Sequence, residues 1–124
     1  MAASSVDRIR ALAEALRALP TPHAFEVALT EYPARDLSIL DVTAERVSKG
    51  SALADLARGL HIGRADVMAL GDNLNDRPML EFAGIPVVMG NASAELKAMG
   101  WLETGPNDEA GVARAIERLA LDRN

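Results

Sequence analysis

The segment from residue 67 to 79 holds the residue types best able to do chemistry. It reads Val-Met-Ala-Leu-Gly-Asp-Asn-Leu-Asn-Asp-Arg-Pro-Met, an apolar run that ends at one glycine before two aspartates and two asparagines. This order is typical of a buried strand that ends in a polar turn, where α/β proteins bind their ligands. Gly71 allows a sharp turn of the backbone, and the start of a following helix favours anions. The segment therefore predicts a ligand site at the carboxyl end of a parallel strand.

The two aspartates of this turn are candidate metal ligands. Asp72 and Asp76 are four residues apart, so in a helix that begins early their carboxylates would project toward one region. Hard oxygen ligands of this type suit Mg²⁺. The alternative interpretation is ordinary helix capping, because Asp and Asn are common at helix starts. Capping is the simpler account of one aspartate alone, whereas the whole hexapeptide after a buried strand favours a site.

Lys49 is a further candidate, since it lies in Val-Ser-Lys-Gly directly before a predicted helix. A lysine at a helix N-terminus opposes the helix dipole, which is unfavourable unless an anion lies nearby. Lys49 is therefore placed either to hold a phosphoryl group or to pair with an aspartate. The plain alternative is a solvated surface lysine.

The first third of the chain predicts a helix followed by a hairpin. A helix capped by Ser4 or Ser5 is predicted to run to about Leu19, because apolar residues recur there at three- and four-residue steps. Pro20 and Pro22 end the helical pattern. Alternating residues then predict strands over 24–30 and 37–42, which together form a hairpin packed on the helix.

From residue 49 onward the patterns alternate between helix and strand. Strands are predicted at 67–70, 85–89 and 101–103, and helices begin near residues 49, 75, 93 and 109. Such alternation predicts a parallel sheet covered by helices on both faces. The expected fold class is therefore α/β.

Composition restricts the kind of protein. The 124 residues, 49% of them hydrophobic, suffice for the core of a small domain. A net charge of −5 argues against nucleic acid or an anionic membrane as a partner. The chain has no cysteine, which excludes disulfides and suits a reducing compartment. Its apolar runs are too short to span a bilayer, and its first residues do not read as a signal peptide. We therefore expect a soluble, cytoplasmic protein.

The combined motifs resemble the C-terminal part of the haloacid dehalogenase (HAD) superfamily, in its Cof-type sugar-phosphatase branch. The resemblance covers about residues 36 to 121. It rests on these residues in order: Lys49-Gly50, Gly71-Asp72-x-x-Asn75-Asp76, Met79-Leu80, Ala83-Gly84, Val88-Met89-Gly90-Asn91-Ala92, Lys97 and Gly111-Val112.

This resemblance implies a fold and a role for each site residue. Residues 1–45 would be the remnant of an α+β cap domain, and residues 46–124 the C-terminal half of a Rossmann-like, three-layer parallel core. Asp72 would ligate Mg²⁺, and Asp76 would support the metal and the lysine. Asn75 would contact the substrate phosphate. Lys49 would neutralise the phosphate or the aspartyl nucleophile, as a catalytic and substrate-binding residue.

One part of the family's pattern is missing. The family's chemistry begins at an Asp-x-Asp that supplies the nucleophile and the general acid/base, and these 124 residues contain no Asp-x-Asp. The family's Ser/Thr motif is missing too. The product of a truncated gene, an excised fragment or one part of a split protein would lack these motifs in the same way. With two carboxylates only, we expect Mg²⁺ binding in the millimolar range at best.

The missing half also leaves a strand without a neighbour. In the family fold the strand Val67-Leu70 pairs with the absent first strand, so here it would lie at an exposed sheet edge. Exposed edges pair with other chains. We therefore predict self-association, or dependence on a complementing N-terminal half, through this strand.

Three hypotheses of function follow from these residues. The first is the C-terminal part of a Mg²⁺-dependent phosphatase for small phosphorylated metabolites such as sugar phosphates, inactive without the attacking half. The second is a non-catalytic module kept for ligand binding or assembly. The third is a truncation product without a function of its own.

Overall fold

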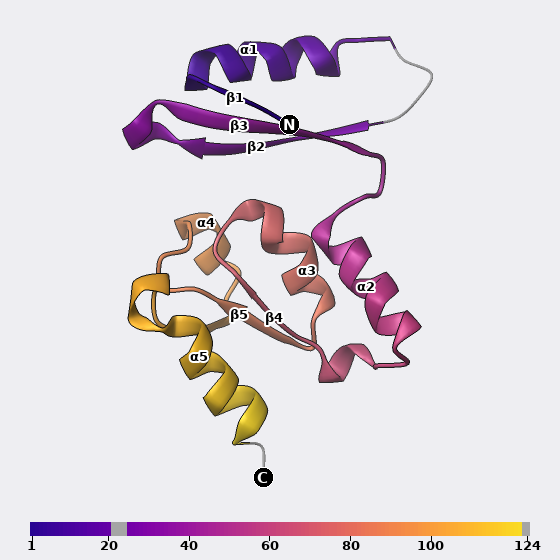
Figure 1. Ribbon diagram of the computed structural model, residues 1–124, viewed down its shortest axis with the longest axis vertical. Helices are drawn as coiled ribbons and strands as arrows, with labels where there is room; N and C mark the ends of the chain where they lie inside the picture. Colours follow the sequence, from indigo (N-terminus) through magenta and orange to yellow (C-terminus); the bar gives the residue numbers. More distant parts are fainter. Residues whose placement is uncertain (21–24, 123–124) are drawn as a thin grey trace. The chain divides into compact units, whose positions relative to one another are not determined.

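The computed structural model describes residues 1–20 and 25–122, which form two compact units, Met1–Val47 and Ser48–Asn124. Figure 1 shows both units along the chain. That the first unit is the remnant of a cap domain stays a prediction.

The first unit is a three-stranded antiparallel sheet with one helix. Its elements are β1 (Ala2–Ser4), α1 (Val6–Arg17), β2 (Phe25–Tyr32), the 3₁₀ turn η1 (Pro33–Arg35) and β3 (Leu37–Ala44). The strand order is β1-β3-β2. Asp36 closes the hairpin turn in the left-handed region, at φ 44°. The helix and the hairpin confirm the sequence prediction, except that Ala24 lies outside the described residues; β1 was not predicted.

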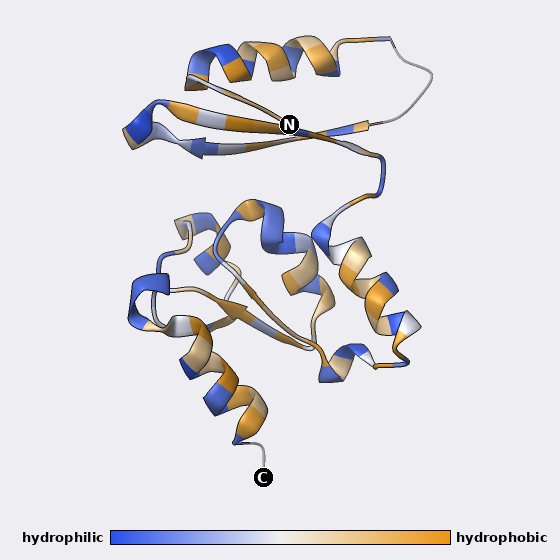
Figure 2. Cartoon of the chain, viewed as in Figure 1, coloured by the Kyte–Doolittle hydropathy of each residue, from blue (hydrophilic) through white to orange (hydrophobic). Residues whose placement is uncertain are grey.

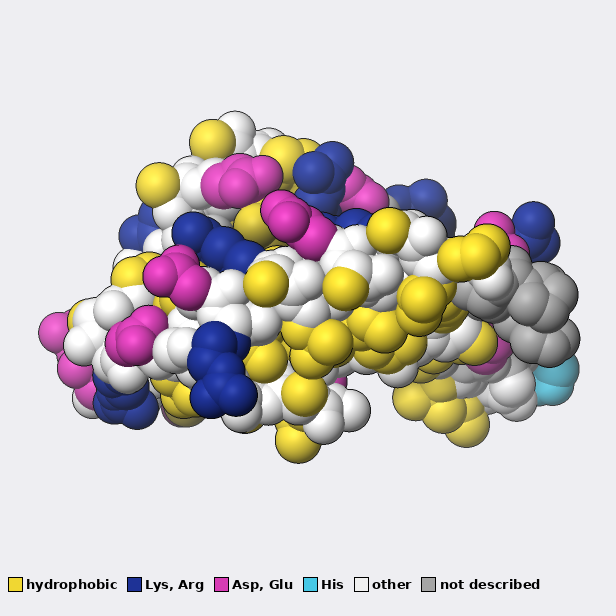
Figure 3. Space-filling model, turned by 90° about the horizontal axis from the view of Figure 1, so that it is seen from above, with side chains coloured by type: hydrophobic (Ala, Val, Ile, Leu, Met, Phe, Trp, Pro, Cys, Tyr) yellow, Lys and Arg dark blue, Asp and Glu magenta, His cyan; other side chains and the backbone are white. Residues whose placement is uncertain are grey.

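Helix α1 packs on this sheet through a small apolar core. Ile9 and Ala13 of the helix are buried against Leu40 of β3. In Figure 2, hydrophilic and hydrophobic residues alternate along α1, as expected for a helix with one apolar face. Figure 3, a view from above, shows hydrophobic side chains lying among acidic and basic ones.

The second unit is an α/β fold with a parallel sheet. Its helices are α2 (Lys49–Gly59), α3 (Arg77–Phe82), α4 (Ala94–Lys97) and α5 (Gly111–Ile116). Its strands are β4 (Met68–Gly71), β5 (Ile85–Val88) and β6 (Leu102–Glu103). Its shorter turns are η2 (Arg64–Asp66), η3 (Leu74–Asp76), η4 (Asn107–Glu109) and the π-helical η5 (Glu117–Leu121). The order β4-β5-β6 is parallel throughout. This confirms the predicted parallel sheet.

Helices lie on both sides of this sheet. In Figure 1, α3 and α2 lie on one side of β4 and β5, and α5 lies on the other. Leu80 of α3, Val88 of β5 and Leu96 of α4 are almost fully buried and form the core. Strand β4 lies at the edge of the described sheet, as the sequence predicts.

Two predicted helices differ in detail from the structure. The helix expected from residue 75 begins as the 3₁₀ turn η3, because the side chain of Asp76 folds back onto the preceding backbone. The helix expected over 109–121 is divided into α5 and η5. None of the helices in the described part of the chain is both long and apolar enough to cross a bilayer.

Candidate functional site

Three of the predicted site residues, Asp72, Asn75 and Asp76, lie in the turn after the parallel strand β4, and the fourth, Lys49, begins α2. Strand β4 ends at Gly71, and a Cβ atom there would lie 2.6 Å from Cβ of Asp76. Real Cβ contacts are not this short, so a glycine is required where the chain turns back past Asp76. The polar segment that follows therefore folds tightly against the end of its own strand.

Helix α2 brings Lys49 to the same place. Ser48 caps the helix, accepting from the backbone N–H of Ser51 at 3.1 Å, and Lys49 is the first helical residue. Gly50 is buried, and a Cβ atom there would lie 2.4 Å from the carbonyl oxygen of Pro78. The missing side chain at residue 50 thus allows the start of α2 to approach the start of α3.

The close approach of the two helices joins Lys49 to Asp76. Nζ of Lys49 donates to Oδ1 of Asp76, and it lies 3.4 Å from Oδ1 of Asn75. The side chain of Asp76 is 7% exposed and that of Lys49 is 50% exposed. Of the two roles that the sequence allows for Lys49, pairing with an aspartate is present in the structure, and half of the lysine remains open to solvent.

Asp76 also holds the turn in shape. Its Oδ2 accepts from the backbone N–H groups of Asp72 and Asn73, at 3.1 and 3.2 Å. Burial by itself would raise the pKa of the Asp76 carboxyl. The hydrogen bond from Lys49 and the two backbone N–H groups outweigh this and hold the pKa below its ordinary value. Asp76 is therefore both a capping residue of this turn and the partner of Lys49, while its role at a metal stays a prediction.

Asp72 lies at the exposed side of the turn. Its Oδ2 accepts from Nδ2 of Asn91 at 3.2 Å, and its backbone carbonyl accepts from the N–H of Ser93 at 3.2 Å. Oδ1 of Asp72 accepts no hydrogen bond from any described residue. Asp72 therefore offers one carboxylate oxygen to a ligand.

The side-chain oxygen atoms of this turn meet part of what Mg²⁺ requires of its ligands. Carboxylate and amide oxygens are the ligands that Mg²⁺ prefers, and it often keeps several waters and binds few carboxylates. Both oxygens of Asp76 already accept hydrogen bonds, which leaves Asp72 as the open carboxylate. No group of three His, Cys, Asp or Glu side chains suited to a metal occurs among the described residues. The chain thus supplies part of a ligand shell.

Sequence reasoning gave no role to Asn91. It lies in the loop after β5 and contacts Asp72 from the loop after β4. The available signal was its place just past the carboxyl end of the next parallel strand, because such ends meet at one edge of a sheet.

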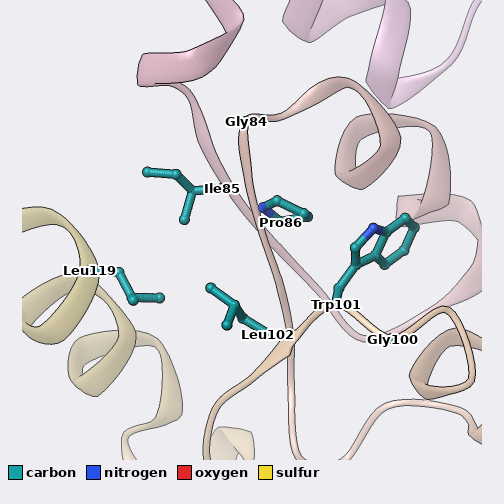
Figure 4. A pocket seen from close by; sticks show the side chains of 7 residues that line it. All are labelled: Gly84, Ile85, Pro86, Gly100, Trp101, Leu102 and Leu119. Carbon is teal, nitrogen blue, oxygen red and sulfur yellow. The ribbon is translucent and has the colours of Figure 1, made fainter.

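A pocket of about 450 Å³ lies elsewhere in the second unit. Figure 4 shows Trp101, Ile85 and Leu119 among the side chains that line it. Ile85 begins β5 and Trp101 directly precedes β6, so the pocket lies at the amino ends of the strands. Its lining is apolar, and it is not the place where Lys49, Asp72 and Asp76 meet.

Comparison with known proteins decides the family. Residues 8–116 match the haloacid dehalogenase-like hydrolase family. This chain belongs to that family. Phosphatase YwpJ of Bacillus subtilis (strain 168) is 43% identical to it over 79 residues, which are 64% of this chain and 28% of that protein.

Solved structures agree with this assignment. A haloacid dehalogenase-like hydrolase from Bacteroides thetaiotaomicron matches with a TM-score of 0.77 and 30% identity, covering 94% of this chain and 41% of that one. The HAD subclass IIB sugar phosphatase BT4131 matches with a TM-score of 0.73 and 30% identity, with the same shares covered. The chain therefore spans less than half the length of each of these relatives.

Proposed function

We propose that this chain is the C-terminal part of a Mg²⁺-dependent phosphatase of the Cof-type branch, acting on small phosphorylated metabolites such as sugar phosphates. The observation that carries the proposal is the half-exposed ammonium of Lys49, held by the buried Asp76 next to the loop of Asp72. A fixed cation beside an open carboxylate suits a phosphate and its metal. The similarity to YwpJ and to the sugar phosphatase BT4131 supports the substrate class.

Each site residue has a part in this proposal. Asp72 would be the direct metal ligand through its open oxygen, while Asp76 would support the metal and keep Lys49 in place. Asn75 and Lys49 would contact the substrate phosphate, with Lys49 neutralising its charge. When bound, Mg²⁺ would supply charge neutralisation of the phosphoryl oxygens.

The attacking carboxylate would come from polypeptide outside these residues. Phosphoryl transfer in this scheme needs an aspartate nucleophile, and the 124 residues hold no Asp-x-Asp. The open edge of β4 supports a partner that pairs with the second unit. Leu56 of α2 and Leu60, which follows this helix, are each 59% exposed and also support a partner. We expect the chain alone to be inactive.

A complementation assay tests the proposal. The chain is mixed with the part of YwpJ that lies outside the segment matching it, and hydrolysis of sugar phosphates is followed with and without Mg²⁺. We expect turnover only in the mixture with Mg²⁺, and none when the chain carries Asp72→Ala. Turnover by the chain alone would contradict the expected inactivity.

The second candidate is a non-catalytic module for ligand binding or assembly. The incomplete metal ligand shell of the described residues favours it. This candidate predicts a partner complex without hydrolysis, and no effect of Mg²⁺ on thermal unfolding of either the chain or the complex.

A further inference from the structure

We infer that Asn91 is a positioning residue whose side-chain amide joins the loops after β4, β5 and β6 and holds the carboxylate of Asp72 in one orientation. Its importance for turnover rests on the proposed function, in which Asp72 is the metal ligand. The orientation itself can be measured without any metal or substrate.

The contacts of Asn91 reach two other loops. Its Nδ2 donates to Oδ2 of Asp72 at 3.2 Å, in the loop after β4. Its Oδ1 accepts from the backbone N–H of Asn107 at 2.9 Å, in the segment after β6. A single side chain therefore bridges three neighbouring strand ends.

These two contacts admit only one orientation of the amide. If the amide were turned over, its oxygen would face a carboxylate oxygen and its N–H₂ group would face a backbone N–H, so both contacts would become repulsive. Asn107 therefore fixes which end of Asn91 faces Asp72. The acceptor in the contact with Asp72 is a carboxylate oxygen, 3.2 Å from the amide nitrogen.

The backbone around Asn91 is held independently of its side chain. The carbonyl of Gly90 accepts from Nζ of Lys97 at 2.6 Å, and the N–H of Gly90 donates to the carbonyl of Gly105 at 3.2 Å. A Cβ atom at residue 90 would lie 2.8 Å from the backbone nitrogen of Pro106, so a glycine is needed for the loops to approach this closely. The N–H of Ser93 holds the backbone of Asp72.

The side chain of Asn91 thus has two partners, the backbone N–H of Asn107 and the carboxylate of Asp72. That carboxylate is exposed, and an exposed aspartate without a partner samples several χ1 rotamers. With Oδ2 held by Asn91, Oδ1 points in a constant direction and is free to bind. Partners that orient a metal ligand in this way typically contribute about 10- to 100-fold in metal affinity.

The first test measures the rotamer of Asp72 by NMR, from the three-bond couplings of its side-chain Cγ to its backbone N and C′. We expect one dominant rotamer in the chain and averaged couplings in Asn91→Ala. Asn91→Asp has the same shape and still accepts from Asn107, but it repels Asp72, so it should average the couplings as well. In Asn91→Asp, the NMR chemical shift of the backbone amide of Asn107 should stay close to its value in the unmodified chain.

The matched control is Asn107→Ala, which keeps the backbone N–H that Asn91 uses and should leave the rotamer of Asp72 unchanged. Backbone amide shifts remote from the three loops report that each variant is folded. The inference is overturned if the unmodified chain already shows averaged couplings at Asp72, or if Asn91→Ala keeps the single rotamer.

The second test titrates Mn²⁺ as a Mg²⁺ probe and follows paramagnetic broadening at the Asp72 loop. We expect a dissociation constant about tenfold higher in Asn91→Ala than in the chain or in Asn107→Ala. A fixed rotamer without any broadening at Asp72 would contradict the proposed metal site and leave Asn91 its positioning role. Broadening with equal affinity in all three would overturn the role of Asn91 and support the metal site.

Discussion

At the scale of residues, Asp76 combines a capping role with an ion pair. A carboxylate at the start of a helical turn is an ordinary cap, and here it accepts the backbone N–H groups of Asp72 and Asn73. The same carboxylate, nearly buried, also receives the ammonium of Lys49. A buried carboxylate with three donors has little freedom to move. The ammonium of Lys49 is therefore held beside this turn, where our proposal places the substrate phosphate.

The lowered pKa of Asp76 makes the role of Lys49 measurable. A carboxyl whose folded-state pKa lies below its ordinary value stabilises the fold above that ordinary value, and the contribution disappears as pH falls through the lowered pKa. Lys49→Met should raise the pKa of Asp76 and lower the free energy of unfolding by about 1–2 kcal/mol at pH 7, after allowance for the solvent exposure of Lys49. The difference should vanish in strong acid. Carbon-13 NMR titration measures the pKa of Asp76, and urea unfolding at pH 7 and in strong acid measures the difference in the free energy of unfolding.

Arg58→Met is the matched control for Lys49→Met. Arg58 pairs with Asp55 on the same helix, but both side chains are mostly exposed, 77% and 71%. Removing this cation should change neither the pKa of Asp76 nor the stability by more than a few tenths of a kcal/mol. Equal effects of the two substitutions would contradict the special position of Lys49.

The site residues divide by how far apart their partners lie in the sequence. The shared turn of Asp72 and Asp76 after β4 was predictable, because an apolar run that ends in a glycine and two aspartates is a local signal. The sequence allowed Lys49 to pair either with an aspartate or with a phosphoryl group, because the helix dipole favours any nearby anion. Asn91 was not assigned a role, because its partners come from two other loops and appear only when three strand ends meet.

At the scale of elements, the contact between α2 and α3 determines whether Lys49 reaches Asp76. Gly50 lies against the backbone of Pro78, so the two helix starts touch without a side chain between them. The capping of α2 by Ser48 fixes where the helix begins and so which residue stands at its first position.

Gly50→Ala should therefore separate the helix starts. A Cβ atom at residue 50 overlaps a backbone carbonyl that has no freedom to move aside, and we expect a loss of about 1–3 kcal/mol in the free energy of unfolding of the second unit. Fluorescence of Trp101, the single tryptophan, follows unfolding of this unit.

Gly59→Ala is the control at the other end of α2. A Cβ atom there meets nothing within 4 Å, so alanine should stabilise the helix by about 0.5–1 kcal/mol. A loss at residue 59 as large as that at residue 50 would contradict the explanation of the Gly50 effect by its close approach to Pro78.

Most elements were predictable because their apolar patterns are local. The helix α1, the hairpin of β2 and β3, and the alternation of the second unit all follow from spacing within short windows. Strand β1 was missed because Ala2–Ser4 has no strand pattern of its own and exists only by pairing with β3, more than thirty residues later. Tertiary pairing of this kind leaves no trace in a short window.

At the scale of the whole molecule, the open edge of β4 is the feature with the widest consequence. Backbone groups alternate sides along a strand, and Val67 and Gly71 turn their carbonyls to β5. Met68 and Leu70 therefore turn theirs to the open edge. Strand β4 has the apolar sequence of a central strand but lies at an edge, and such an edge tends to pair with a second chain.

We expect the chain to self-associate with rising concentration through this edge. Met68→Pro removes an outward N–H at the first residue of β4, where proline is tolerated, and should give a folded monomer. Analytical ultracentrifugation over a range of concentrations measures both. An unmodified chain that stays monomeric at high concentration would contradict the prediction.

The most direct measurement of the central claim is the turnover of a chimera in which this chain's segment replaces the matching segment of phosphatase YwpJ. We predict that the chimera hydrolyses sugar phosphates with Mg²⁺, and that Lys49→Met or Asp72→Ala lowers kcat by about 10²–10³ while Asn107→Ala does not. A folded chimera without turnover, or one that keeps full turnover after both substitutions, would contradict the claim that this chain carries the metal and phosphate side of a phosphatase site.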